Sequence, residues 1–321
     1  MATSEQIKSL IRSHCDNDRE RFLTIALQVA AHEAKKGHDG IAHDIRSLVD
    51  KAKSGSGKVI PFNREFSDLV LASSPSTQIS ELILAREKCD RIQRIILEYR
   101  QQDKLKKHGL GNRKKILLAG PPGTGKTLTA SVLASELKLP LFTILMDKLV
   151  TKFMGETSAK LRQIFDLIRA RRGVYLFDEF DAIGAERGRE NDVGEMRRVL
   201  NSFLQLIEQE KSDSLIIAAT NNAKILDHAL FRRFDDILYY DLPTTDEIIR
   251  LIKNRLCEFK PAKMSLKTTI MAAEKLSHAE IGQACDDAIK AAILSDRQKV
   301  TATDLKAMLK ERRSAYGYSS S

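Results

Sequence analysis

Short apolar runs alternate with helix-forming runs through the middle of the chain. The apolar runs lie at residues 116–119, 141–145, 174–177, 214–219 and 237–240, and helical runs lie between them at 128–138, 158–172 and 195–208. Strands that alternate with helices predict a parallel sheet covered on both faces, with a ligand at the carboxyl ends of the strands. We therefore predict an α/β fold.

Helical patterns flank this region on both sides. Apolar residues at helical spacing predict helices within residues 7–53, a long helix at 79–99, and helices at 246–252, 270–276, 279–294 and 303–310. Residues 54–58, Ser-Gly-Ser-Gly-Lys, have the composition of a flexible linker. We predict a helical module with its linker at 1–60, an α/β domain at 61–243 and a helical region at 244–321.

The composition is that of an ordinary globular protein. Hydrophobic residues make up 42% and charged residues 30% of the chain, and no apolar run approaches the roughly 18 residues of a membrane span. No signal-peptide pattern is visible, and four dispersed cysteines lack the spacing of a disulfide framework or a metal knuckle. We expect a cytoplasmic protein without a membrane partner.

The formal net charge is +10, with local basic excess at residues 104–107, 113–115 and 169–172. Such runs are usually solvated faces, although positive potential would also suit a nucleotide or an acidic partner. Nucleic acid stays an alternative partner on charge alone.

The sharpest motif directly follows the first apolar run. Residues 120–127, Gly-Pro-Pro-Gly-Thr-Gly-Lys-Thr, match the pattern G-x-x-x-x-G-K-[ST] between a predicted strand and a predicted helix. Such a loop can close on phosphates, which the start of the helix also attracts. Lys126 would contact the β and γ phosphates, and the Thr127 hydroxyl would ligate Mg²⁺. The predicted nucleotide contacts are Gly120, Pro121, Pro122, Gly123, Thr124, Gly125, Lys126, Thr127 and Leu128. A chance Gly/Pro-rich turn would not account for eight fixed positions and both flanks.

Two further strand ends carry polar residues suited to hydrolysis. The run 174–177 ends in Asp178 and Glu179, which we assign to Mg²⁺ binding and to deprotonation of an attacking water. The run 214–219 is followed by Asn221, which can hold that water or a γ-phosphate oxygen. The alternatives are a solvated strand end and an ordinary Asx turn, respectively.

Together these motifs resemble the AAA family of ATPases over about residues 65–312. Residues 120–127 are similar to the family's Walker A motif, 174–181 to its Walker B motif and 218–221 to its sensor 1 strand. The resemblance implies a P-loop AAA+ sheet sandwiched by helices, with a C-terminal helical lid. It also implies an ATPase that uses Mg²⁺ and assembles as a homo-hexamer.

Residues 227–235 resemble the end of the family's second region of homology. Arg232 and Arg233 match the paired arginines that reach into a neighbouring subunit's nucleotide, where a guanidinium stabilises transition-state charge by about 10³-fold or more. They are adjacent here, whereas many members separate them by Pro-Gly, so the identity of the finger stays open. A salt-bridged pair at a helix end is the structural alternative.

Residues 151–157 are similar to the family's first pore loop. The resemblance implies that Lys152, Phe153 and Met154 grip a protein substrate in a central channel, with residues 188–194 as a second, more variable loop. Apolar side chains make no sequence-specific hydrogen bonds, so they can contact a polypeptide of any sequence. The alternative is a core contact from a bent loop.

The resemblance also implies contacts to adenine. His278 and Ala279 stand where many members have Ser-Gly-Ala, with histidine in place of glycine, and Asp68 with Leu69 would flank the base on the other side.

The whole layout is similar to bacterial ATPases encoded beside subtilisin-like serine proteases in phage defence. Any proteolysis would come from such a partner, because the chain has no G-x-S-x-G and no H-E-x-x-H. We predict a hexameric ATPase that threads or remodels proteins. The alternatives are a nucleic-acid ATPase, such as a helicase loader or initiator, and a slow nucleotide-gated scaffold.

Overall fold

The computed structural model describes residues 19–36, 38, 40, 42–47, 49, 69–149, 154–184, 190–223, 228–261 and 266–315. The chain forms two compact units, Met1–Asn63 and Arg64–Ser321. In the first unit, helix α2 (Arg19–Lys35) buries Ile25, Ala26, Val29 and Ala30, which recur at helical spacing. Residues 42–47 are helical as well, so helices are confirmed in the described part of 7–53.

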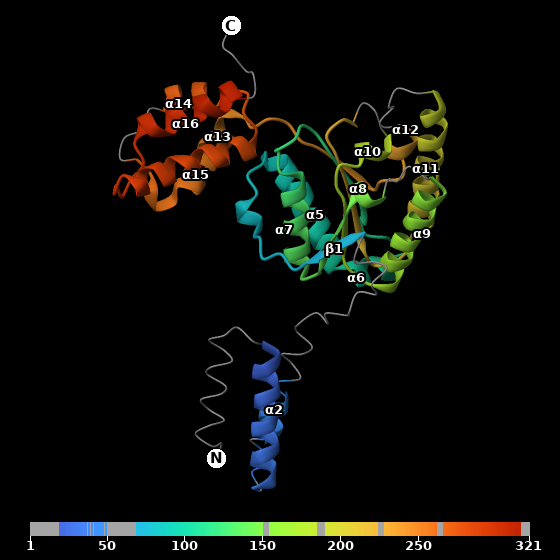
Figure 1. Cartoon of the computed structure of the whole chain (residues 1–321). Helices are drawn as coiled ribbons and strands as arrows, with labels where there is room; N and C mark the ends of the chain where they lie inside the picture. The colour runs from blue at the N-terminus through green and yellow to red at the C-terminus, as the bar shows by residue number, and fades with distance from the viewer. Residues whose placement is uncertain are drawn as a thin grey trace. The chain divides into compact units, whose positions relative to one another are not determined.

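The second unit contains a six-stranded sheet (Figure 1). Its strands, in spatial order, are β1 (Val70–Ser73), β3 (Leu141–Ile144), β4 (Val174–Phe177), β5 (Leu215–Thr220), β2 (Lys115–Ala119) and β6 (Asp236–Tyr239). All neighbours pair in parallel except β1 and β3, which are antiparallel. The α/β fold and the five predicted strands are confirmed, whereas the edge strand β1 was not predicted.

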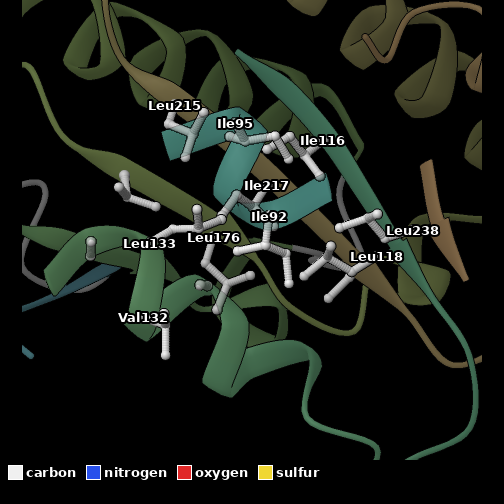
Figure 2. Close-up of a cluster of buried hydrophobic side chains, with 14 of the residues drawn as sticks. Ile92, Ile95, Ile116, Leu118, Val132, Leu133, Leu176, Leu215, Ile217 and Leu238 are labelled. Atoms are coloured by element: carbon white, nitrogen blue, oxygen red, sulfur yellow. The ribbon is translucent and has the colours of Figure 1, made fainter. Parts of the chain in front are cut away.

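Alternate residues of each strand face opposite layers of helices, as the period of a strand requires. Helices α5 (Arg86–Arg100) and α7 (Lys126–Leu137) pack over Ile116, Leu118, Leu176 and Ile217 (Figure 2). Helices α9 (Met154–Ala170) and α11 (Glu190–Gln209) cover the other face. The ring centroids of Phe165 in α9 and Phe203 in α11 lie 6.2 and 5.3 Å, respectively, from the ring centroid of Phe177 in β4. The shorter helices are α6 (Gln102–Lys107), α8 (Met146–Leu149), α10 (Asp181–Gly184) and α12 (His228–Phe231).

Four C-terminal helices form a smaller lid with a core of its own. They are α13 (Thr245–Leu256), α14 (Leu266–Ala273), α15 (His278–Leu294) and α16 (Ala302–Ala315), and a 3-10 turn at Cys257–Phe259 follows α13. Thr244 and Ser277 are the N-cap residues of α13 and α15, and each forms a capping box. No helix in the described ranges is long and apolar enough to cross a membrane. The domain limits at 60 and 243 stay predictions.

The long helix predicted at 79–99 is wrong in its first part. A 3-10 turn at Ile79–Glu81 is followed by four non-helical residues before α5 begins at Arg86. Leu82, Ile83 and Leu84 are all buried. Leu82 and Leu84 pack in the core cluster of the sheet, and Ile83 between them does not belong to it. This alternation suits an extended segment, because residues two apart on a helix point to nearly opposite sides. The Arg250 guanidinium of α13 donates to the Leu84 carbonyl at 2.9 Å, which ties this segment to the lid.

Candidate active site

A cavity of about 950 Å³ lies where the carboxyl ends of the strands meet the lid. The phosphate loop and the polar strand ends line one side, and lid residues line the other. Its lining includes Ser80, Glu81, Ile83, Pro122, Gly123, Thr124, Gly125, Lys126, Thr127, Leu128, Asp178, Glu179, Asn221, Leu251, Asn254, Arg255, His278, Ala279, Gln283 and Asp286. The structure thus brings together residues from three predicted strand ends.

Glycine is required at two points of the phosphate loop, where other parts of the chain approach closely and φ is positive. A Cβ on Gly120, whose φ is +153°, would lie 2.1 Å from the Tyr240 carbonyl oxygen. A Cβ on Gly123, whose φ is +72°, would lie 2.5 Å from Ser277 Oγ. The Ala279 amide donates to the Gly123 carbonyl at 3.0 Å, so the start of α15 docks directly on the loop. Lid and phosphate loop are therefore in contact through backbone atoms.

Lys126 is enclosed by the loop that it follows. Its ammonium donates to the carbonyls of Gly120 and Pro121, both at 2.8 Å, and the residue is only 6% exposed. Burial lowers the pKa of Lys126, and the nearby carboxylate of Asp178 opposes that shift. Lys126 is also the first residue of α7. The unpaired N–H groups in the first turn of a helix favour an anion.

The acidic pair at the end of β4 faces the loop. The Thr127 hydroxyl donates to Asp178 Oδ2 at 2.7 Å, which places two hard oxygen ligands side by side. Glu179 is exposed, lines the cavity and has a left-handed φ of +52°. A left-handed non-glycine residue is uncommon and marks a position that the surrounding structure holds in place. The arrangement can hold a cation beside an anion, with a carboxylate nearby.

Asn221 joins this group from the end of β5. Its backbone N–H donates to Asp181 Oδ1 at 3.2 Å, and the residue lines the cavity. The strand order explains the meeting, because β5 lies between β4 and β2 and ends on the same edge. The roles of Glu179, Asn221 and the loop residues stay predictions.

The two arginines have different surroundings, just beyond α12 and outside the cavity lining. Arg233 forms an ion pair with Glu208 of α11 at 3.2 Å. Arg232 is exposed and forms no ion pair with the residues that the structure describes. The salt-bridge alternative therefore applies to Arg233, and the role of Arg232 stays a prediction.

Two of the residues predicted to contact adenine line the cavity, and their contact with the base stays a prediction. His278 and Ala279 line the cavity, but both ring nitrogens of His278 are buried. Burial lowers the pKa of His278, and the carboxylate of Glu247 opposes that shift. Asp68 lies outside the described residues.

The structure places Leu69, the other residue predicted to flank adenine, away from the cavity lining. Leu69 is buried beside β1, where its carbonyl accepts from the Leu145 amide at 2.9 Å, and it does not line the cavity. The physical reason is the sheet order, because β1 is an edge strand separated from β2 by β3, β4 and β5. Ile83 lines the cavity instead.

The predicted pore loops fall largely outside the described part of the chain. Lys152 and Phe153 are not described, and Met154 is the first residue of α9, without a described side chain. Of the second loop, residues 190–194 form the first turns of α11, and 188–189 lie outside the described residues.

Apart from His278 and Ala279, the lid residues that line the cavity were not predicted from the sequence. Arg255 and Asp286 form a bidentate ion pair there, with Nε and Nη2 of Arg255 at 2.7 and 2.6 Å from the carboxylate oxygens. Helical periodicity marks the helices that carry these residues. It does not tell which face looks into the cavity, because docking at Gly123 decides that.

Comparison with known proteins supplies the remaining evidence. Residues 116–242 match the model of the ATPase family associated with various cellular activities (AAA). The chain is 34% identical to an uncharacterized AAA family ATPase, y4kL, of Sinorhizobium fredii over 97% of this chain and 96% of that protein. It is 34% identical to the proteasome-activating nucleotidase of Methanococcus vannielii over 64% of this chain and 52% of that protein. It is 38% identical to the peroxisomal ATPase PEX6 of Saccharomyces cerevisiae, over 43% of this chain and 14% of that protein.

Proposed function

The chain belongs to the AAA family of ATPases, and we propose that it hydrolyses ATP in the cavity between its phosphate loop and its lid. The observation that carries this proposal is the meeting of Lys126, Asp178 and Glu179 at one edge of the sheet. Phosphates would replace the Gly120 and Pro121 carbonyls as partners of the Lys126 ammonium, and the N–H groups of α7 would hold the same anion.

Thr127 and Asp178 fit Mg²⁺, which takes one or two protein oxygens together with phosphate and water oxygens. Bound there, Mg²⁺ would neutralise charge on the β and γ phosphates. Glu179 would accept the proton of the attacking water, and Asn221 would orient that water without adding charge.

We further propose a homo-hexamer that remodels or threads protein. The support is the similarity to a proteasome-activating nucleotidase and a peroxisomal ATPase, together with the match of residues 151–157 to a pore loop. The chain spans about half the length of that nucleotidase (52%). The nature of the protein substrate follows from neither similarity.

Phe153→Ala tests the threading proposal. We expect basal ATP hydrolysis close to wild type, because Phe153 is not among the predicted nucleotide contacts, and loss of substrate unfolding, because the proposed grip on polypeptide is removed. The measurement is ATPase turnover together with the unfolding of a fluorescent protein that carries an unstructured tag. Equal unfolding by Phe153→Ala and by wild type would refute threading.

Arg232→Ala tests whether activity requires neighbouring subunits. Because Arg232 is exposed and Arg233 is paired with Glu208, we expect Arg232→Ala to keep ATP binding and to lose hydrolysis by about 10³-fold. Mixing it with Lys126→Ala subunits should restore part of the activity, since some interfaces then combine an intact loop with an intact arginine. No recovery in mixed assemblies would contradict an arginine that acts across an interface.

A further inference from the structure

The three basic runs of the sequence meet at the amino ends of the strands, on the edge opposite the cavity. Residues 104–107 end α6, residues 113–115 lead into β2, and residues 169–172 end α9 and lead toward β4. Parallel strands place their amino ends on one edge of the sheet, which explains the meeting. Figure 1 shows α6 at the opposite end of the α/β domain from α10 and α12.

Asp213, just before β5, connects the runs. Its carboxylate accepts from Lys114 at 2.7 Å and from Lys106 at 3.2 Å. The Tyr99 hydroxyl donates to the Asp213 carbonyl and accepts from Arg172 Nε at 2.9 Å. The hydrogen bonds from Lys114 and Lys106 lower the pKa of Asp213. A single carboxylate thus serves two ammonium groups and has little capacity left for further cations.

Several cations on this edge have no such partner. Lys104, Lys107 and Lys211 are exposed and form no ion pair with any residue in the described ranges. Leu110, at the end of the same basic segment, is 59% exposed. We call Lys104, Lys107, Lys211 and Leu110 the basic edge.

We propose that the basic edge is a docking surface for an acidic segment of a partner protein. The three lysines supply positive potential for carboxylates, and Leu110 supplies an apolar contact for a side chain of that segment. The proposal concerns a surface remote from ATP and does not depend on the proposed function.

The arginines of the edge favour a carboxylate-bearing peptide over nucleic acid. Arginine is the side chain best suited to phosphate, because its fork binds two oxygens at once. Here Arg113 is engaged with Glu98 at 2.7 Å, Arg169 with Glu210 at 3.2 Å, and Arg172 with Tyr99. Arg169 and Arg172 are exposed but engaged in these contacts, whereas Lys104, Lys107 and Lys211 form no ion pair with the described residues. An apolar anchor such as Leu110 contributes nothing to the binding of a phosphate backbone.

The test compares three labelled probes on the full chain by fluorescence anisotropy. The probes are a peptide of Glu-Glu-Leu repeats, the same peptide with glutamine in place of glutamate, and a single-stranded DNA of equal charge. The charge reversal Lys104→Glu/Lys107→Glu should weaken binding of the acidic peptide by about tenfold or more, because two attractions become repulsions. Leu110→Ser should weaken the acidic peptide and leave DNA unchanged. The matched control is Lys306→Glu/Lys310→Glu on α16, where two lysines likewise form no ion pair with described residues.

ATP hydrolysis should be unchanged in all of these variants, which separates this test from that of the proposed function. The docking proposal is overturned if the wild type does not bind the acidic peptide, if the neutral peptide binds equally well, or if the α16 control loses as much affinity as the reversal. If DNA binds more tightly than the acidic peptide and is weakened equally by Lys104→Glu/Lys107→Glu, the partner is nucleic acid and the peptide proposal is overturned.

Discussion

Lys126→Ala should lower the affinity for ATP by about 100-fold or more, because hydrogen bonds to charged groups contribute roughly 1.5–3 kcal/mol each and the ammonium can reach two phosphates. In the structure, Lys126 already donates two bonds of 2.8 Å to the loop carbonyls. An alanine would leave those two carbonyls without that donor as well. Isothermal titration with ATP and with a non-hydrolysable analogue measures the affinity directly.

Lys253→Ala is the matched control, because Lys253 is an exposed lysine on α13 outside the cavity lining. It should bind ATP as the wild type does. Urea unfolding of both variants shows whether any loss at Lys126 is a loss of folding. A folded Lys126→Ala protein with unchanged affinity would mean that the loop does not hold the phosphates, and the proposed chemistry would fail with it.

Much of the α/β fold follows from the sequence because the five predicted strands are short and mostly apolar and alternate with helices. Residues 174–177 are entirely buried and contain no polar position, and such a run suits only the inside of a covered parallel sheet. The phosphate loop is equally determined, since Gly120 and Gly123 occupy places where a side chain would collide with other backbone or with Ser277.

What the sequence did not predict depends on contacts between distant segments. Leu82, Ile83 and Leu84 continue a helical pattern, yet Leu82 and Leu84 pack in the sheet core while Ile83 lines the cavity, and this alternation favours an extended segment. Leu69 follows the family pattern locally, but the antiparallel pairing of β1 with β3 puts it away from the cavity. The different environments of Arg232 and Arg233 likewise depend on Glu208, which is 24 or more residues away in the chain and close only in the folded state.

Glu179→Gln should keep ATP binding and reduce hydrolysis by about 10²–10⁴-fold, the usual range for loss of a general base. Glutamine has the shape of glutamate but cannot accept the proton of water. The residue is exposed to the cavity and lies beside Asp178, whose carboxylate stays hydrogen-bonded to Thr127. Single-turnover hydrolysis of ATP, with binding measured in parallel, separates the chemical step from affinity.

The ATP-bound form that Glu179→Gln accumulates also distinguishes the proposed remodeller from its alternatives. A remodeller requires repeated turnover, so Glu179→Gln should assemble with ATP and bind substrate but fail to unfold it. Full biological function of the trapped form would favour a nucleotide-gated scaffold, and stimulation of wild-type hydrolysis by DNA but not by unfolded protein would favour a nucleic-acid ATPase.

Proteins that co-purify with the trapped form test the proposed protease partner in defence, because a stable complex without any protease would contradict that pairing.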